Sequence, residues 1–225
     1  MPEYRRDLPL RPAFMRGRPL SDKGYPVPYF VAWIDGKPDF RVIDPVRMSK
    51  CVREHRCWLC GLPLPKKHTV FVIGPMCLVN RISSEPPSHW ECARYAVRAC
   101  PFLVLPKAHR REANLPANAS HAAGLPIARN PGVIALWQCS TWEKLPVKGA
   151  LFGVGEPESI EFWTEGREAR ADEVAESFWS GVDILQKEAE RGGAANAVHL
   201  AWLVDRALPL LPEGAFIPAR RALLS

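Results

Sequence analysis

The sequence CWLCG (57–61), with HWEC (89–92) beginning 29 residues after Cys60, decides the fold. Two cysteines separated by two residues can hold one tetrahedral ion from a tight turn, and the glycine that follows permits the turn. Residues three apart on a helix share a face, so the second pair can present an imidazole and a thiolate to the same ion. The pattern predicts a zinc site formed by Cys57, Cys60, His89 and Cys92.

The predicted zinc is structural, because four protein ligands leave no position for an activated water. In zinc-finger peptides metal binding contributes about 10–16 kcal/mol, which is comparable to the stability of a whole domain. We therefore expect the proline-rich residues 61–87 to depend on the ion for their shape.

The other cysteines are expected to pack as small apolar side chains. Cys51, Cys77 or Cys100 could each replace His89 as a ligand, and Cys139 lies far along the chain. Seven cysteines, an odd number, with no visible signal peptide favour a reducing, cytoplasmic compartment. A thioredoxin-like redox motif is disfavoured, because no βαβ pattern surrounds the first pair.

The order of elements around the ligands resembles a treble-clef zinc finger, in which a knuckle and a hairpin precede a helix that supplies the remaining ligands. The hairpin is predicted from two apolar runs, 68–73 and 76–82, around Gly74-Pro75. The helix is expected to end at Cys100-Pro101. The resemblance covers residues 57–100 and implies no particular function.

The flanking regions predict a small α+β protein. Residues 28–34 and 38–43 suggest a hairpin around Asp35-Gly36, and Asp44-Pro45 is expected to begin a helix. In the last third, three strands are predicted at 133–142, 150–155 and 159–164, the last two as a meander, followed by two helices separated at Gly192-Gly193. The fold class is thus a treble-clef-like zinc unit joined to a small antiparallel sheet with a C-terminal αα-hairpin.

Composition changes along the chain suggest its organisation. The predicted segments are a flexible basic arm at 1–27, the hairpin, helix and zinc-binding unit at 28–105, a proline-rich linker at 106–132, a three-stranded sheet with two helices at 133–210, and a tail at 211–225. No apolar run approaches the ~20 residues of a membrane-spanning helix, so a membrane partner is not expected.

The distribution of charge suggests an anionic partner for the front half of the chain. Residues 1–130 carry 21 basic and 10 acidic side chains, whereas residues 131–225 carry 9 and 14. Nucleic acid is the commonest such partner, although an arginine-rich chain can also carry this bias for solvation alone. The candidate nucleic-acid contacts are Arg5, Arg6, Arg11, Arg16, Arg18, Arg94 and Arg98.

The order of three residues also suggests an HNH-like nuclease as an alternative. HNH endonucleases place a general-base histidine, an asparagine and a metal-binding histidine in the order that His68, Asn80 and His89 follow here. Two features disagree with the HNH pattern: Lys67 precedes the first histidine where an aspartate is usual, and a zinc-bound His89 could not also hold the catalytic ion.

The stretch FVIGPMCLVNRISSEPPSHWECARYAVRACPFL (71–103), with CWLCG before it, resembles a family of uncharacterised proteins carried by bacteria and their phages. The later EFWTEGREARADEVAESFWSGVDIL (161–185) is similar to the C-terminal part of the same family. The resemblance spans most of residues 30–210. It implies a bacterial or phage origin and no established activity.

Three function classes remain from the sequence. The first is a non-enzymatic, zinc-stabilised adaptor or inhibitor that binds a host protein or nucleic acid, and it is preferred. The second is a nucleic-acid-binding protein that uses the basic front half, and the third is the HNH-like metal-dependent nuclease. The sequence has no glycine-rich phosphate loop, no Ser-His-Asp order and no H-E-x-x-H motif, so another enzyme class is not favoured.

Overall fold

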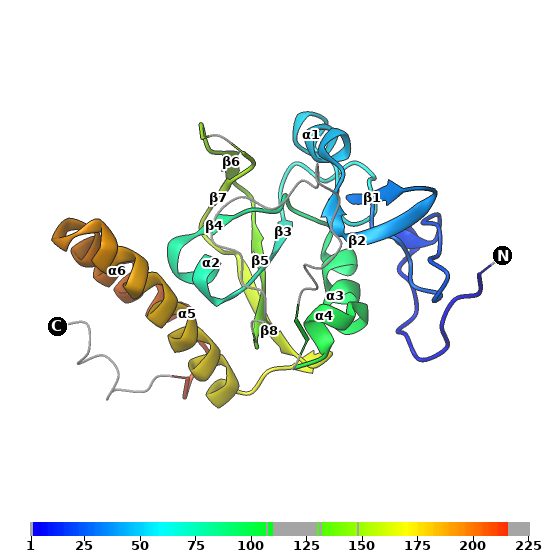
Figure 1. The fold of residues 1–225 in the computed structure, drawn as a ribbon. Helices are drawn as coiled ribbons and strands as arrows, with labels where there is room; N and C mark the ends of the chain where they lie inside the picture. Colours follow the sequence, from blue (N-terminus) through cyan, green and yellow to red (C-terminus); the bar gives the residue numbers. More distant parts are fainter. Residues whose placement is uncertain (1, 107, 110–129, 131, 148, 216–225) are drawn as a thin grey trace.

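The computed structural model describes residues 2–106, 108–109, 130, 132–147 and 149–215. This part of the chain combines helices with three small antiparallel sheets (Figure 1). The elements, in chain order, are η1 (Ala13–Met15), β1 (Val31–Ile34), β2 (Lys37–Ile43), α1 (Pro45–Arg53), β3 (Thr69–Ile73), α2 (Pro75–Asn80), β4 (Ile82–Ser83), α3 (Trp90–Ala99), α4 (Pro101–Val104), β5 (Ile134–Cys139), β6 (Trp142–Lys144), β7 (Phe152–Val154), β8 (Ser159–Thr164), β9 (Arg167–Glu168), α5 (Ala171–Gly192), α6 (Ala194–Ala207) and η2 (Leu208–Leu210).

The largest sheet has the strand order β3-β5-β8-β9 and lies between two layers of helices (Figure 1). Alternate side chains of a strand point to opposite sides of the sheet, and buried residues follow one another along β5. Both faces of this strand are therefore covered. Trp137 packs on the side of α2 and α5 with Phe178, whereas Leu136 packs on the side of α3 with Val97. This double burial explains why the strand is an almost continuous apolar run.

The pairing of β3 with β5 joins the front and rear parts of the chain. Thr69 lies opposite Cys139, and Phe71 lies opposite Trp137. The units that we predicted at 28–105 and 133–210 therefore contribute strands to one sheet and side chains to one apolar cluster. Most of the predicted linker, 106–132, lies outside the described residues. Near its C-terminal end, the Asn130 side chain donates to the carbonyls of Phe102 and Leu105, and so holds this part of the chain beside α4.

The predicted hairpin of 68–73 and 76–82 is wrong in its second half. Only the first run is a strand of the central sheet, and Pro75 begins the helix α2. Proline at the first helical position has its φ angle already set, and Met76, Leu78 and Val79 then face the core. The short strand β4 follows and pairs with β7 instead of β3.

The strands of the last third are present, but their neighbours differ from the prediction. β8 pairs with β5 in the central sheet, whereas β7 belongs to a second sheet of order β4-β7-β6. The meander of the last two strands is therefore wrong, because β7 and β8 lie in different sheets.

The local turn and helix predictions agree with the structure. Asp35 and Gly36 have φ angles of 49° and 74° at the turn of the β1–β2 hairpin, and the Asp44 side chain accepts from the first-turn amides of α1. α5 and α6 form the predicted αα-hairpin, with Gly193 (φ 93°) between them. Within the described residues, no helix combines the length and apolar character that a bilayer crossing requires.

The N-terminal segment, residues 2–27, is packed rather than a free arm. Met15 and Val27 are buried, the Tyr4 hydroxyl lies 2.9 Å from that of Tyr95 on α3, and Leu20 pairs with Pro26. The expectation of a flexible arm overlooked these apolar and aromatic residues among the prolines and arginines. At the other end, Ala215 of the predicted tail is buried, and residues 216–225 lie outside the description.

Candidate metal centre

The first two candidate ligands, Cys57 and Cys60, lie in a tight turn after α1. The Cys57 amide donates to the Leu62 carbonyl, and the Gly61 amide donates back to the Cys57 carbonyl, both at 2.8 Å. Gly61 has a φ of +82°, and a Cβ atom there would lie 2.5 Å from the Tyr29 ring. A glycine is required at this position for both reasons.

The other two ligands lie at the start of α3. His89 is the residue before the helix, in an extended conformation, and Cys92 is in the first turn. The Trp58 amide donates to the Pro87 carbonyl at 3.1 Å, which holds this helix start beside the knuckle. The sequence placed both residues on the helix, whereas His89 precedes it by one position.

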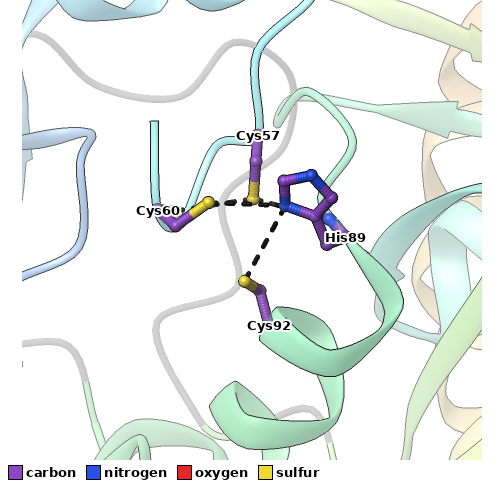
Figure 2. Close-up of side chains that lie close together, drawn as sticks. All are labelled: Cys57, Cys60, His89 and Cys92. Carbon is purple, nitrogen blue, oxygen red and sulfur yellow. Dashed lines mark hydrogen bonds between the residues drawn. The ribbon is translucent and has the colours of Figure 1, made fainter. Parts of the chain in front are cut away.

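The four side chains point toward one another (Figure 2). Their ligand atoms, three Sγ and one imidazole nitrogen, all lie within 4.8 Å of one another. The Nδ1 atom of His89 lies 3.4 Å from Cys60 Sγ and 3.9 Å from Cys92 Sγ. Zinc–ligand distances of 2.3 Å for sulfur and 2.0–2.1 Å for nitrogen give tetrahedron edges of about 3.6 Å between N and S. The cluster therefore has dimensions that suit one tetrahedral ion.

Backbone and carbonyl groups orient the ligand atoms. The amides of Cys60 and His89 donate to Cys57 Sγ at 3.5 and 3.4 Å, and the Leu62 amide donates to Cys60 Sγ at 3.5 Å. The Nε2–H of His89 donates to the Pro63 carbonyl at 2.9 Å, since a carbonyl can only accept. This bond keeps a proton on Nε2 and directs Nδ1 at the thiols, so Nδ1 is the nitrogen that would bind a metal ion, as in many metal-ligating histidines.

The protonation of the cluster is shared among its members. Burial raises the pKa of the Cys57 thiol, but hydrogen bonds from the side chains of Cys60, Cys92 and His89 outweigh it, so the pKa is lowered overall. Hydrogen bonds to Cys57 and Cys60, together with burial, raise the pKa of Cys92. Burial lowers the pKa of His89, and hydrogen bonds to the same two thiols raise it to about 10. Shared protons thus hold the four donor atoms together, and a bound cation would displace these protons.

The cluster is enclosed by protein. All four residues are buried, and the ring of Phe14 stacks on the imidazole of His89 with centroids 4.3 Å apart and planes at 13°. Cys51 is also buried beside the knuckle, where its thiol donates to the Cys57 carbonyl at 3.9 Å, and burial raises its pKa to about 12. Among the described residues, Cys57, Cys60, His89 and Cys92 form a buried group that could hold a metal ion.

The remaining cysteines are not part of this group. Cys77 is on α2, Cys100 ends α3, and Cys139 is buried on β5, where burial raises its pKa to about 11. Cys77 and Cys139 pack in the apolar cluster of the core, which agrees with the role expected from the sequence.

The three residues of the nuclease alternative are dispersed among different contacts. His68 lies before β3, with its Nδ1 2.5 Å from a Glu158 carboxylate oxygen. Asn80 ends α2, and its side chain accepts from the Ile82 amide at 2.9 Å. His89 belongs to the cysteine cluster, and His68 does not join it. The hairpin that would carry an HNH site is also replaced by β3 and α2.

Most of the candidate nucleic-acid arginines already have partners within the protein. Arg94 pairs with Glu161 and Arg5 pairs with Asp7, in both cases through two hydrogen bonds. Arg18 donates to the Val27 carbonyl at 2.8 Å, and Arg11 lies over the Tyr4 ring. For Arg6, Arg16 and Arg98 no side-chain ion pair is recorded with another described residue.

Sequence reasoning missed Phe14 and Pro63, which touch the imidazole from two sides. The position of Pro63 beside the site could have been expected from the sequence, because it follows the knuckle by two residues and the chain must turn there. The position of Phe14 could not, since it lies 75 positions before His89 in a segment without periodicity. Comparison of the chain with protein-family models, with curated proteins and with solved structures gave no match.

Proposed function

We propose that this protein is a non-enzymatic adaptor or inhibitor of phage or bacterial origin, stabilised by a structural zinc ion, that binds a host protein. The observation that carries the proposal is the closed and buried set of four ligand atoms from Cys57, Cys60, His89 and Cys92. Such a set joins the knuckle to α3 and supports a binding surface rather than a reaction.

Zinc is the ion that these donors favour. Three thiolates and one imidazole at tetrahedral spacing are a common structural zinc set, whereas magnesium and calcium prefer oxygen ligands. With four protein ligands the coordination shell is complete, and the ring of Phe14 covers the imidazole. The ion would supply a cross-link between two segments that are 29 residues apart.

The β1–β2 hairpin supports a protein partner. Trp33 and Phe40 remain 39% and 44% exposed although both are large and apolar. Trp33 lies opposite Pro38, and Phe40 follows two positions later, where the register of the hairpin shifts. Exposed aromatic residues of this kind are enriched where proteins bind one another. The hairpin forms a sheet of its own, away from the central sheet (Figure 1).

The arginine pairs favour this partner over nucleic acid. The ion pairs of Arg5 with Asp7 and of Arg94 with Glu161 neutralise charges that phosphate groups would otherwise bind. A phosphate contact at either site would first have to break an ion pair that the protein already makes. The surplus of basic residues in the front half therefore overstates the charge available to a polyanion.

The zinc site is tested by elemental analysis of the purified protein, where we expect one zinc per chain. Cys92→Ser should lose the ion and lower the Tm by many degrees. Cys77→Ser is the matched control, because Cys77 is half-buried and lies outside the cluster. Folded wild-type protein without zinc would contradict the proposal.

The partner is tested by capture from a nuclease-treated bacterial lysate. We expect wild-type protein to retain a defined host protein, and the double variant Trp33→Ala/Phe40→Ala, with its zinc intact, to lose it. A salt titration with DNA and RNA is the second arm, because phosphate contacts produce a steep loss of affinity with salt. Salt-dependent binding to DNA or RNA, with no host protein retained from the nuclease-treated lysate, would favour the nucleic-acid alternative.

A further inference from the structure

The N-terminal segment, residues 2–27, lies directly on the metal centre. Phe14 stacks on the ring of His89, and Met15, 2% exposed, packs in the apolar cluster that contains Cys57, Cys60 and Cys92. Both residues belong to the single turn η1. The short helix thus contacts the ligand side chains themselves rather than a distant part of the core.

Two further contacts fasten the segment to elements that carry ligands. The Tyr4 hydroxyl meets that of Tyr95 on α3, the helix of Cys92. Arg18 lies over the ring of Tyr29, whose amide donates to the Leu59 carbonyl between the two knuckle cysteines. The ring of Tyr29 also lies against Gly61. The segment is therefore attached to both halves of the metal site.

Side-chain contacts rather than strand pairing hold the segment in place. The backbone hydrogen bonds that its amides donate go to other residues of the segment, as from Arg5 to Gly24, and Leu20 forms a β-bridge with Pro26. Its attachment to the rest of the chain thus rests on surfaces such as the His89 ring and the apolar cluster around Met15. The knuckle and the start of α3 form these surfaces together, so an ion that joins the two would hold the surfaces in place.

We propose that the N-terminal segment is a strap whose docking is coupled to metal occupancy: it closes over the loaded site and is released when the ion leaves. This inference rests on the proposed zinc site. By linkage, a strap that docks only on the loaded site also tightens metal binding. Because the ion cannot leave until the strap opens, the strap also slows metal loss. Release would uncover Met15 and the apolar cluster beneath it.

The first experiment measures zinc transfer from the full-length protein to a chromophoric chelator. Phe14→Ala should speed the transfer roughly two- to twelvefold, the range that a stacked aromatic pair contributes. Phe14→Leu should lie between this variant and wild type, because it keeps apolar bulk and loses the stacked ring. Leu10→Ala is the control, since Leu10 is in the same segment, is 86% exposed and should change nothing.

The second experiment uses wild-type protein alone and follows trypsin cleavage at Arg16-Gly17 and Lys23-Gly24. Zinc-loaded protein should be cut slowly at these bonds and chelated protein at least tenfold faster, while cleavage after Lys187 in α5 rises less and reports global unfolding. Two results would overturn the strap alone. One is zinc-containing protein with equal transfer rates for Phe14→Ala and Leu10→Ala, and the other is strap cleavage that chelation does not change. Folded protein without zinc would overturn the strap and the proposed function together.

Discussion

Arg94 on α3 and Glu161 on β8 form a two-point ion pair across 67 residues of sequence. Arg94 Nε donates to Glu161 Oε2 at 2.8 Å, and the same oxygen accepts from the Trp163 indole at 3.0 Å. Burial raises the pKa of Glu161, but the hydrogen bonds from Arg94 and Trp163 outweigh it, so the pKa is lowered overall. A residue that looked free to bind phosphate thus ties the helix of the metal site to the central sheet.

A double-mutant cycle on this pair should give a coupling free energy of about 0.2–1 kcal/mol, the range for ion pairs at the protein surface. The variants are Arg94→Ala, Glu161→Gln and both together, compared by urea unfolding. Arg98→Ala, four residues further along the same helix, should change stability by less than ~0.5 kcal/mol. Additive effects of the two substitutions would show that the pair contributes nothing to folding.

Gly61→Ala should weaken the knuckle through two separate effects. The φ of +82° disfavours any residue with a Cβ atom, and that atom would also collide with the Tyr29 ring at 2.5 Å. Gly36→Ala isolates the first effect, because Gly36 has a φ of +74° and nothing within 4 Å. We expect Gly61→Ala to cost at least ~1 kcal/mol more than Gly36→Ala by thermal unfolding, and to lower the zinc content. Equal losses would exclude the contact with Tyr29 as a cause.

Glu173 should make the start of α5 sensitive to acid. A hydrogen bond from Arg167 and one from the Arg170 amide outweigh burial and lower its pKa from 4.5 to about 2. A carboxyl whose pKa is depressed by folding contributes stability above its unfolded pKa, and loses it as the pH falls toward the folded value. The stability difference between wild type and Glu173→Gln should therefore be full above pH 4.5 and vanish toward pH 2.

The control for this experiment is Glu176→Gln, an exposed position one turn along the same helix. Its difference from wild type should stay near zero over the same pH range. Both variants keep the metal site unchanged, so acid release of the ion affects all three proteins alike. A Glu173→Gln difference that does not change with pH would argue against the Arg167 contact.

Gly181→Ala should destabilise the protein although alanine is the better helix former. α5 approaches α2 so closely that a Cβ atom at Gly181 would lie 2.8 Å from the Pro75 Cβ and 3.0 Å from the Met76 amide nitrogen. Overpacking of this kind costs about 1–3 kcal/mol. Gly17→Ala, with nothing within 4 Å, should be close to neutral in the same urea titration. A stabilised Gly181→Ala variant would mean that the two helices separate easily.

The four residues of the candidate metal centre were predictable because their spacing is local. The pairs Cys57–Cys60 and His89–Cys92 each lie within four residues, and only the distance between the pairs had to be closed by folding. Asp35-Gly36 and Asp44-Pro45 were predictable for the same reason, since a turn or a cap depends on neighbouring residues.

The pairing of strands was not predictable in this way. β3 and β5 are both almost continuous apolar runs, so no alternation of polar residues selects a partner or a register for them. The Pro75 helix could have been found, because the rule that identified Pro45 as a helix start applies equally to it. The docked N-terminal segment could not, since Phe14 and His89 meet only in the folded protein.

The pairing of β3 with β5 also has a consequence for synthesis on the ribosome. Thr69 and Cys139 are 70 residues apart, which at ~5–20 residues per second corresponds to roughly 4–14 s of translation. Throughout that interval the strand TVFVI has an open edge, of a composition that favours pairing with another nascent chain. The four ligands have all been synthesised before β5, and α3 packs on β3 through Val70 and Ala93. An ion captured at this stage would hold that helix over one face of the waiting strand, and would leave less of its apolar surface open to another nascent chain.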